Sequence, residues 1–89
     1  MRIIYTTQFK KDYKKIKKQK KDINKLKEII EKIVSGKTLG IKYRDHQLSG
    51  IFKGYRDCHI DPDWLLIYKK TTVSLVLERT GSHSELFKK

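Results

Sequence analysis

Apolar residues in the first third of the chain recur every three or four positions, which predicts two amphipathic helices. The first stripe consists of Phe9, Tyr13 and Ile16. Thr6 or Thr7 precedes it as a capping residue, the pattern lapses through the lysine-rich residues 17–21, and Asp22 offers a second cap. The second stripe ends before Gly36, a residue type favoured after helices, and consists of Ile23, Leu26, Ile29, Ile30, Ile33 and Val34.

The other apolar segments are short and rich in β-branched and aromatic residues, as strands are. We expect strands over residues 2–6, 52–59, 64–69 and 73–80, and a short helical turn in the tail after Gly81. Leu75 and Leu77 alternate with more polar positions, so their face of the sheet should receive the helices. This order of elements predicts one α+β domain over residues 1–89, with a small four-stranded, mainly antiparallel sheet and both helices on one face.

The net charge of the chain indicates what kind of partner it binds. Lysine and arginine number 22 against 10 acids, a net charge of +12, so the surface should attract a polyanion. Nucleic acid, an anionic membrane face and an acidic protein all qualify, and charge alone does not choose among them. Most lysines of the two helices have no carboxylate within a helical turn, so contact with backbone phosphate is favoured over a merely solvated lysine face. A membrane surface is disfavoured because the apolar stripes are already needed to cover the sheet.

The single cysteine, Cys58, excludes an intramolecular disulfide and a cysteine-based zinc site. Alternation along the strand turns it away from its neighbours, so we expect a structural role. No segment resembles a signal peptide or a membrane span, which predicts a cytoplasmic protein without a membrane partner. We also expect no metal, because the three histidines lie 13 and 24 residues apart, as their numbers give, in cationic surroundings.

Candidate chemistry gathers at the ends of the later strands. All three histidines of the chain, His46, His59 and His83, flank predicted strands. Histidine moves protons near neutral pH, and carboxylates at the same strand ends favour a catalytic reading. Trp64 opens the most apolar strand and either packs in the core or stacks on a nucleobase, and Phe87 carries the same ambiguity.

These residues resemble the YafQ branch of the RelE/ParE toxins of bacterial toxin–antitoxin systems. The resemblance covers essentially the whole chain and is densest from Asp45 to Phe87. It is carried by Asp45, His46, Leu48, Gly50, residues 53–57, His59, residues 62–64, the apolar strand to Lys69, residues 78–81 and His83. The departures are Gln47, Cys58, Ser82 and two extra C-terminal lysines, and none of them removes a proton-transfer group.

The resemblance implies a small basic endoribonuclease that cuts mRNA in the ribosomal A site and is silenced by a cognate antitoxin, with no cofactor. It implies catalytic or substrate-contacting roles for His46, His59, Asp63, Trp64, His83 and Phe87, with Asp57 as a weaker candidate. A non-nucleolytic toxin of the same fold, for example one directed at gyrase, or a nucleic-acid- or antitoxin-binding module is the alternative.

Cleaving RNA without a metal needs a base for the 2′-hydroxyl, an acid for the departing 5′-oxygen and cations for the phosphorane. We expect His83 as the acid and His59 or Asp63 as the base, with the reverse assignment open. His46 would help to position the substrate. Lys53, Arg56 and Arg79 are the expected substrate-binding cations.

Overall fold

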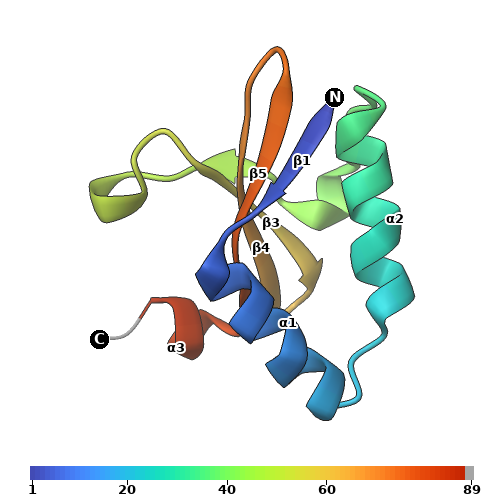
Figure 1. Ribbon diagram of the computed structural model, residues 1–89, viewed down its shortest axis with the longest axis vertical. Coiled ribbons are helices and arrows are strands. Elements are labelled where there is room, and N and C mark those ends of the chain that lie inside the picture. Colours follow the sequence, from blue (N-terminus) through green and yellow to red (C-terminus); the bar gives the residue numbers. More distant parts are fainter. Residues whose placement is uncertain (88–89) are drawn as a thin grey trace.

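The computed structural model describes residues 1–87, so the two extra lysines at the C-terminus lie outside the described residues. Strands and helices follow one another in the order shown in Figure 1. Their bounds are β1 Arg2–Tyr5, α1 Thr7–Lys18, α2 Ile23–Val34, the 3₁₀ turn η1 Ile41–Tyr43, β2 His46–Gln47, the 3₁₀ turn η2 Gly50–Phe52, β3 Arg56–Asp61, β4 Trp64–Lys70, β5 Ser74–Gly81 and α3 His83–Leu86.

Five strands form the sheet, in the order β1-β5-β4-β3-β2. β1 lies parallel to β5, and the other neighbouring pairs are antiparallel. The prediction of four strands missed β2, because His46 and Gln47 pair with β3 without any apolar pattern of their own. The α+β class and the mainly antiparallel sheet are confirmed.

The helix caps are those that the sequence predicts. Thr6 caps α1 by accepting a hydrogen bond from the backbone N–H of Phe9 at 3.0 Å. Its hydroxyl also donates to the carbonyl of Glu78 at 2.9 Å, which fixes the start of α1 to β5. Asp22 caps α2 by accepting from the N–H of Asn24 at 3.0 Å. Each cap satisfies a backbone donor that a helix start leaves free, which stabilises the helix by roughly 1 kcal/mol.

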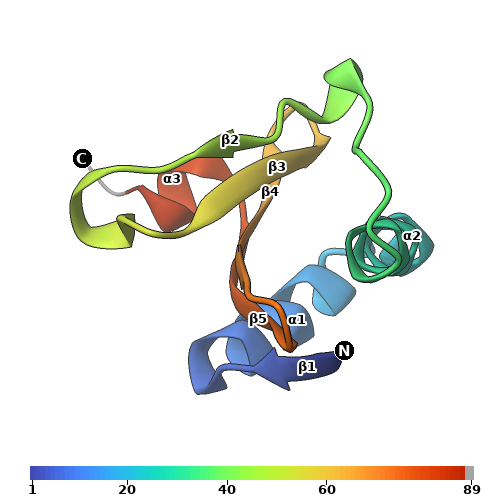
Figure 2. The same ribbon diagram turned by 90° about the horizontal axis from the view of Figure 1, so that it is seen from above.

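The main core lies between the two long helices and one face of the curved sheet (Figure 2). Leu75 and Leu77 of β5 are fully buried in it, which confirms that the leucine face receives the helices. From the helices it takes Phe9, Ile16, Leu26, Ile29 and Ile33. Each of these five side chains is at most 4% exposed. Cys58 is buried in the same core, and burial raises the pKa of its thiol, so its structural role stands.

The opposite face of the sheet carries a smaller apolar cluster. Leu65 and Ile67 of β4 pack there with Leu86 of α3, and Phe52 and Phe87 lie against them. The third helix therefore covers part of the face that α1 and α2 leave free, and it confirms the helical turn expected in the tail. Within residues 1–87, no helix is long and apolar enough to cross a membrane.

Candidate active site

Strand β3 places two of the candidate groups on the face away from the long helices. Cys58 and Ile60 point into the main core, so Asp57 and His59, which alternate with them, point to the other side. Asp57 is only 3% exposed, whereas His59 is partly exposed. The strand thus holds an imidazole at the surface beside a buried carboxyl group.

His46 reaches the same place through β2. It pairs directly with Asp57 across the two strands, and its Nδ1 lies 3.0 Å from Oδ1 of Asp57. The same nitrogen lies 2.8 Å from the backbone carbonyl of Arg44. Only the contact to the carbonyl has hydrogen-bond geometry, because Oδ1 of Asp57 has no hydrogen-bond partner. We take the contact to Asp57 as an ion pair that forms when His46 is protonated.

His83 comes from the first residue of α3. Its ring Nδ1 lies 2.7 Å from Oδ1 of Asp63, a residue of the turn between β3 and β4. The backbone N–H of His83 donates to the same oxygen at 3.0 Å. With Nδ1 facing the carboxylate, Nε2 is the ring nitrogen left for a substrate.

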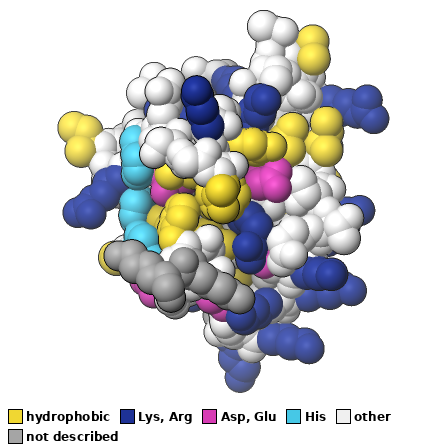
Figure 3. Space-filling model, turned by 90° about the vertical axis from the view of Figure 1, so that its left-hand side faces the viewer, with side chains coloured by type: hydrophobic (Ala, Val, Ile, Leu, Met, Phe, Trp, Pro, Cys, Tyr) yellow, Lys and Arg dark blue, Asp and Glu magenta, His cyan; other side chains and the backbone are white. Residues whose placement is uncertain are grey.

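The three histidines form one row on the surface, seen as a continuous cyan column in Figure 3. The ring centroids of His46 and His59 are 6.5 Å apart, and those of His59 and His83 are 5.3 Å apart. Hydrogen bonds to a phosphate oxygen are about 2.7–3.2 Å long, so the rings of His59 and His83 are close enough to contact one phosphate group. The structure thus brings together all three predicted histidines, Asp57 and Asp63.

Burial sets the protonation of the central groups. It lowers the pKa of the His59 imidazole, against the opposing effect of the Asp57 carboxylate. It also raises the pKa of Asp57, although the nearby histidines oppose that rise. Because His59 releases its proton more readily than a free histidine does, it is neutral at neutral pH and able to accept a proton.

Two buried polar atoms in this cluster have no hydrogen-bond partner. They are Oδ1 of Asp57 and Nδ1 of His59. Oδ1 of Asp57 is an acceptor, and Nδ1 of His59 carries a proton in one of the two neutral tautomers. Both side chains lie on the same face of β3. Buried polar groups are nearly always satisfied. With the proton on Nδ1, Nε2 of His59 is the free base.

Asp63 is ionised in this arrangement. The hydrogen bonds from the backbone and ring of His83 hold its pKa below the usual range. A carboxylate with a lowered pKa is a weak proton acceptor, so the geometry favours His59 over Asp63 as the base. Asp63 instead fixes the orientation of His83.

The arginines expected to bind substrate lie elsewhere. Arg56 points to the opposite face of β3, where its Nε donates to Asp45 at 3.0 Å. Asp45 also accepts from the hydroxyl of Tyr68 at 2.8 Å, so Arg56 belongs to a structural network. Arg79 donates to Asp12 of α1 at 2.8 and 3.1 Å, and Asp12 is 7% exposed. Both arginines form ion pairs with carboxylates within the fold, which favours a structural role, and substrate binding by them stays a prediction.

Trp64 also departs from the expectation of a base platform. Its side chain is 1% exposed and lies in the main core. The indole Nε1 donates to Oγ1 of Thr80 at 2.9 Å, and that hydroxyl donates to the carbonyl of Leu65 at 2.8 Å. A buried ring offers no face to a nucleobase. Of the two roles predicted for Trp64, this structure therefore favours packing in the core.

Two further predicted residues lie at the margin of the site. Phe87 packs edge-on against Phe52 with ring centroids 5.9 Å apart, and it remains partly exposed just after α3. Lys53 is exposed in the turn between η2 and β3. Phe87 follows the helix that carries His83, and so remains a candidate for base contact.

Glu85 supports the site without having been predicted from the sequence. It closes a capping box with Ser82 at the start of α3 and forms an ion pair with Lys15 of α1. These contacts lower the pKa of Glu85 to about 2. The spacing Ser-x-x-Glu from Ser82 to Glu85 is the recognised signal for such a box. Glu85 thereby holds the helix that presents His83.

The arrangement as a whole suits acid–base chemistry on a phosphodiester. It offers a neutral imidazole, a second imidazole oriented by a carboxylate, and a third beside them. Among the described residues, no group of three histidine, cysteine, aspartate or glutamate side chains is placed to hold a metal ion. The imidazoles and carboxylates at the site are groups that donate and accept protons.

Comparisons with known proteins agree with this geometry. The family model described as the bacterial toxin of type II toxin–antitoxin system, YafQ, matches residues 1–88. The chain is 48% identical over 86 residues to the mRNA interferase toxin YafQ of Escherichia coli, covering 96% of this chain and 94% of that protein.

Solved structures give the same result. The crystal structure of YafQ from E. coli matches with a TM-score of 0.92 and 46% identity, over 98% of this chain and 99% of that one. The crystal structure of the E. coli DinJ–YafQ complex matches with a TM-score of 0.90 and 47% identity over the same shares. The chain therefore belongs to the YafQ family of bacterial toxins of type II toxin–antitoxin systems.

Proposed function

We propose that this protein is an endoribonuclease toxin that cleaves mRNA and thereby inhibits translation. The observation that carries the proposal is the close approach of His59 and His83, whose ring centroids are 5.3 Å apart on an open face of the sheet. Its family membership and its similarity to a protein named mRNA interferase support the same activity. Since the substrate is mRNA, we propose that the toxin acts in the bacterial cytoplasm.

In the proposed reaction, His59 is the general base. Its lowered pKa makes it neutral at neutral pH, and it removes the proton from the 2′-hydroxyl next to the scissile phosphate. The 2′-oxygen attacks the phosphorus, and the bond from phosphorus to the 5′-oxygen breaks. The product strand then ends in a 2′,3′-cyclic phosphate, with no metal required.

His83 is the general acid. Asp63 holds its Nδ1 at 2.7 Å, which directs Nε2 toward the departing 5′-oxygen. Protonation of that oxygen completes the cleavage and leaves a 5′-hydroxyl on the second strand. Asp63, ionised and bonded to His83, is a positioning residue, and Asp57 has the same role toward His59.

His46 extends the row on the side away from His83. Its Nδ1 lies 3.0 Å from the carboxyl of Asp57, so a protonated His46 would add positive charge beside the reacting phosphate. That charge would stabilise the negative charge that builds up on the phosphorane. We therefore assign His46 to transition-state stabilisation.

We further propose that a cognate antitoxin silences this toxin and that cleavage takes place in the ribosomal A site. The structure of the E. coli relative in complex with DinJ supports an antitoxin partner. The net charge of +12 supports an RNA-rich target, because each phosphate contact with a lysine or arginine releases counterions. The lysines of α1 and α2 supply nine of the 22 basic residues: Lys10, Lys11, Lys14, Lys15, Lys17, Lys18, Lys25, Lys27 and Lys32.

Expression of the chain in bacteria, followed by mapping of new 5′ ends on mRNA, tests the proposal. We expect growth arrest and new 5′ ends within coding regions. If the ribosome is required, these ends should fall at a constant position within the codons. A His83→Ala variant should produce neither, while retaining its circular dichroism spectrum. Growth arrest without new mRNA ends would instead favour a non-nucleolytic toxin.

A further inference from the structure

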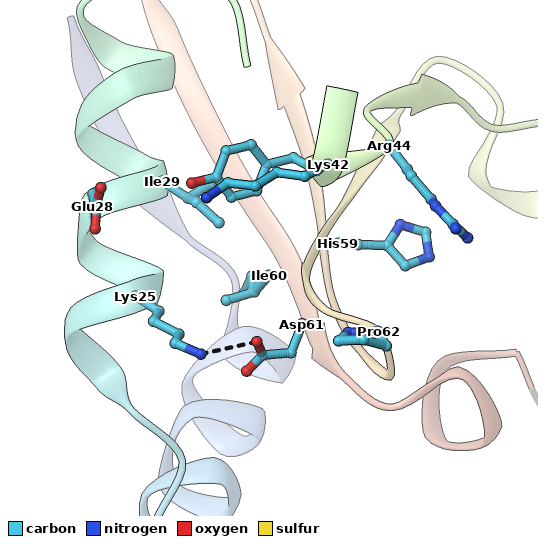
Figure 4. A pocket seen from close by; sticks show the side chains of 10 residues that line it. Lys25, Glu28, Ile29, Lys42, Arg44, His59, Ile60, Asp61 and Pro62 are labelled. Atoms are coloured by element: carbon cyan, nitrogen blue, oxygen red, sulfur yellow. Dashed lines mark hydrogen bonds and ion pairs between the residues drawn. The ribbon is translucent and has the colours of Figure 1, made fainter. Parts of the chain in front are cut away.

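A cleft of about 460 Å³ opens beside His59, between α2, η1 and the outer edge of β3. Figure 4 shows it from close by, with Lys25 and Ile29 on the helix side and His59 on the other. Ile60 and Pro62 also line it. The cleft therefore adjoins the row of histidines and is large enough for part of a nucleotide.

Two cations of this cleft form no ion pair with any described residue. Lys25 is paired with Asp61 at 3.0 Å, and Glu28 is paired with Lys32 at 3.5 Å. By contrast, the ion pairs within residues 1–87 include neither Lys42 nor Arg44. These two side chains are exposed and free to bind an anion.

The backbone at Arg44 places this charge next to the catalytic row. Arg44 adopts a left-handed conformation, with φ 46° and ψ 46°, that non-glycine residues rarely adopt. Its side chain extends toward the same side as the His59 ring (Figure 4), and its positive charge contributes to the lowered pKa of His59. Its carbonyl oxygen lies 2.8 Å from Nδ1 of His46. Arg44 thus links the cleft to the histidines.

The outer edge of β3 supplies groups that recognise a base. β2 pairs only with Arg56 and Asp57, so the stretch from Cys58 to Asp61 forms an open edge among the described strands. An open edge presents backbone donors and acceptors. The ring of Tyr43 forms a wall nearby, with Lys42 Nζ 5.0 Å from its centroid. Polar edge groups, an apolar surface and free cations together match a single-stranded nucleotide.

We propose that this cleft binds the nucleotide adjoining the scissile phosphate of the RNA. Arg44 holds the phosphate on the side of the histidines, and Lys42 holds the next phosphate on the side of α2. The base lies over Ile60 and Pro62 against the open edge of β3. The inference rests on the proposed nuclease function and adds to it the residues that determine which nucleotide is accepted beside the cleavage point.

Titration with an unreactive nucleotide tests this site without any cleavage. We would add adenosine 3′,5′-bisphosphate to the ¹⁵N-labelled wild-type protein and follow amide chemical shifts, with inorganic phosphate and adenosine as separate probes. The largest saturable shifts should fall on Tyr43, Arg44 and residues 59–61. Inorganic phosphate should move only the first two, and shifts confined to the lysines of α1 would overturn the proposal.

Variants make the test quantitative. Lys42→Ala and Arg44→Gln should each weaken the affinity for the bisphosphate by about tenfold, as expected for loss of a charged hydrogen bond. Lys27→Ala is the control, because Lys27 lies on α2, which borders the cleft, but lines a separate groove with α1. Glu28→Lys should tighten binding by roughly threefold, since it adds positive charge to the wall of the cleft.

The outcomes separate the cleft from the nuclease. Equal weakening by Lys27→Ala and by the two cleft variants would exclude a specific site, and would leave the proposed cleavage intact. Specific binding in the cleft together with wild-type protein that yields no cyclic-phosphate product would refute the nuclease function and with it the role given to this site. Specific binding together with RNA cleavage supports both.

Discussion

Asp63 accepts two hydrogen bonds from His83 through a single oxygen, one from the backbone N–H at 3.0 Å and one from ring Nδ1 at 2.7 Å. The two residues are 20 positions apart in the chain, at the β3–β4 turn and the start of α3. This double contact fixes both the helix start and the direction of the ring. In the proposed reaction, this contact orients His83 to act as the general acid.

Replacing Asp63 by Asn should preserve the shape of this contact and remove its charge. We expect the rate of RNA cleavage to fall by about 10- to 100-fold, less than the loss on removal of His83, because the imidazole stays but is less firmly oriented. Single-turnover cleavage rates measure the effect. Glu31→Gln, on the exposed surface of α2, is the control, and an unchanged rate in Asp63→Asn would exclude the positioning role.

The pH profile of cleavage should report His59. Because burial lowers its pKa, the base form persists below the ordinary value of about 6.5, and the acidic limb of kcat/KM should have its midpoint below that pH. The Asp57 carboxylate opposes the shift, so Asp57→Asn should move the limb to still lower pH. A limb that stays in place in Asp57→Asn would contradict the assignment of His59 as the base.

Glu85 should stabilise the protein only while it is ionised. Its pKa is lowered from 4.5 to about 2 by Lys15 and the backbone of Ser82, so its contribution is complete above pH 4.5 and is lost as the pH falls toward 2. Glu85→Gln should therefore lower the free energy of unfolding by about 1–2 kcal/mol at pH 7. Urea unfolding at several pH values should show this difference shrinking below pH 4.5.

Trp64→Phe distinguishes a core residue from a base platform. The variant loses the buried hydrogen bond to Thr80, which spans 2.9 Å, and should destabilise the fold by about 1–3 kcal/mol. Cleavage per folded molecule should be unchanged. Phe87→Ala should show the opposite pattern, with reduced cleavage and a smaller loss of stability. Loss of activity in a fully folded Trp64→Phe protein would restore the stacking role.

Much of the fold could be predicted because its signals are local. The periodic stripes and the caps Thr6 and Asp22 defined both long helices, and alternation at Leu75 and Leu77 identified the covered face of the sheet. The two-residue strand β2 could not be predicted, since it depends on pairing with a distant strand. Its hydrogen bonds, rather than any apolar pattern, hold it in the sheet.

The site was partly predictable for the same reason. The resemblance supplied the three histidines and Asp63, but their proximity depends on the register of β2 against β3 and on the turn before α3. Trp64 lies in a run of five apolar residues, in which both faces look alike, so its side could not be inferred. The direction of the Arg56 side chain could have been predicted, because strand alternation places it on the opposite face of β3 from Asp57.

The chemistry of the cleaved ends tests the central claim most directly. Wild-type protein should cut mRNA, on ribosomes if they are required, to give a 2′,3′-cyclic phosphate and a 5′-hydroxyl. Cleavage of RNA in a ribosome-free assay should survive EDTA. His59→Ala and His83→Ala should each lower the cleavage rate by about 10²- to 10⁴-fold. Ends that carry a 5′-phosphate, or full activity in either histidine variant, would contradict the acid–base mechanism proposed for His59 and His83.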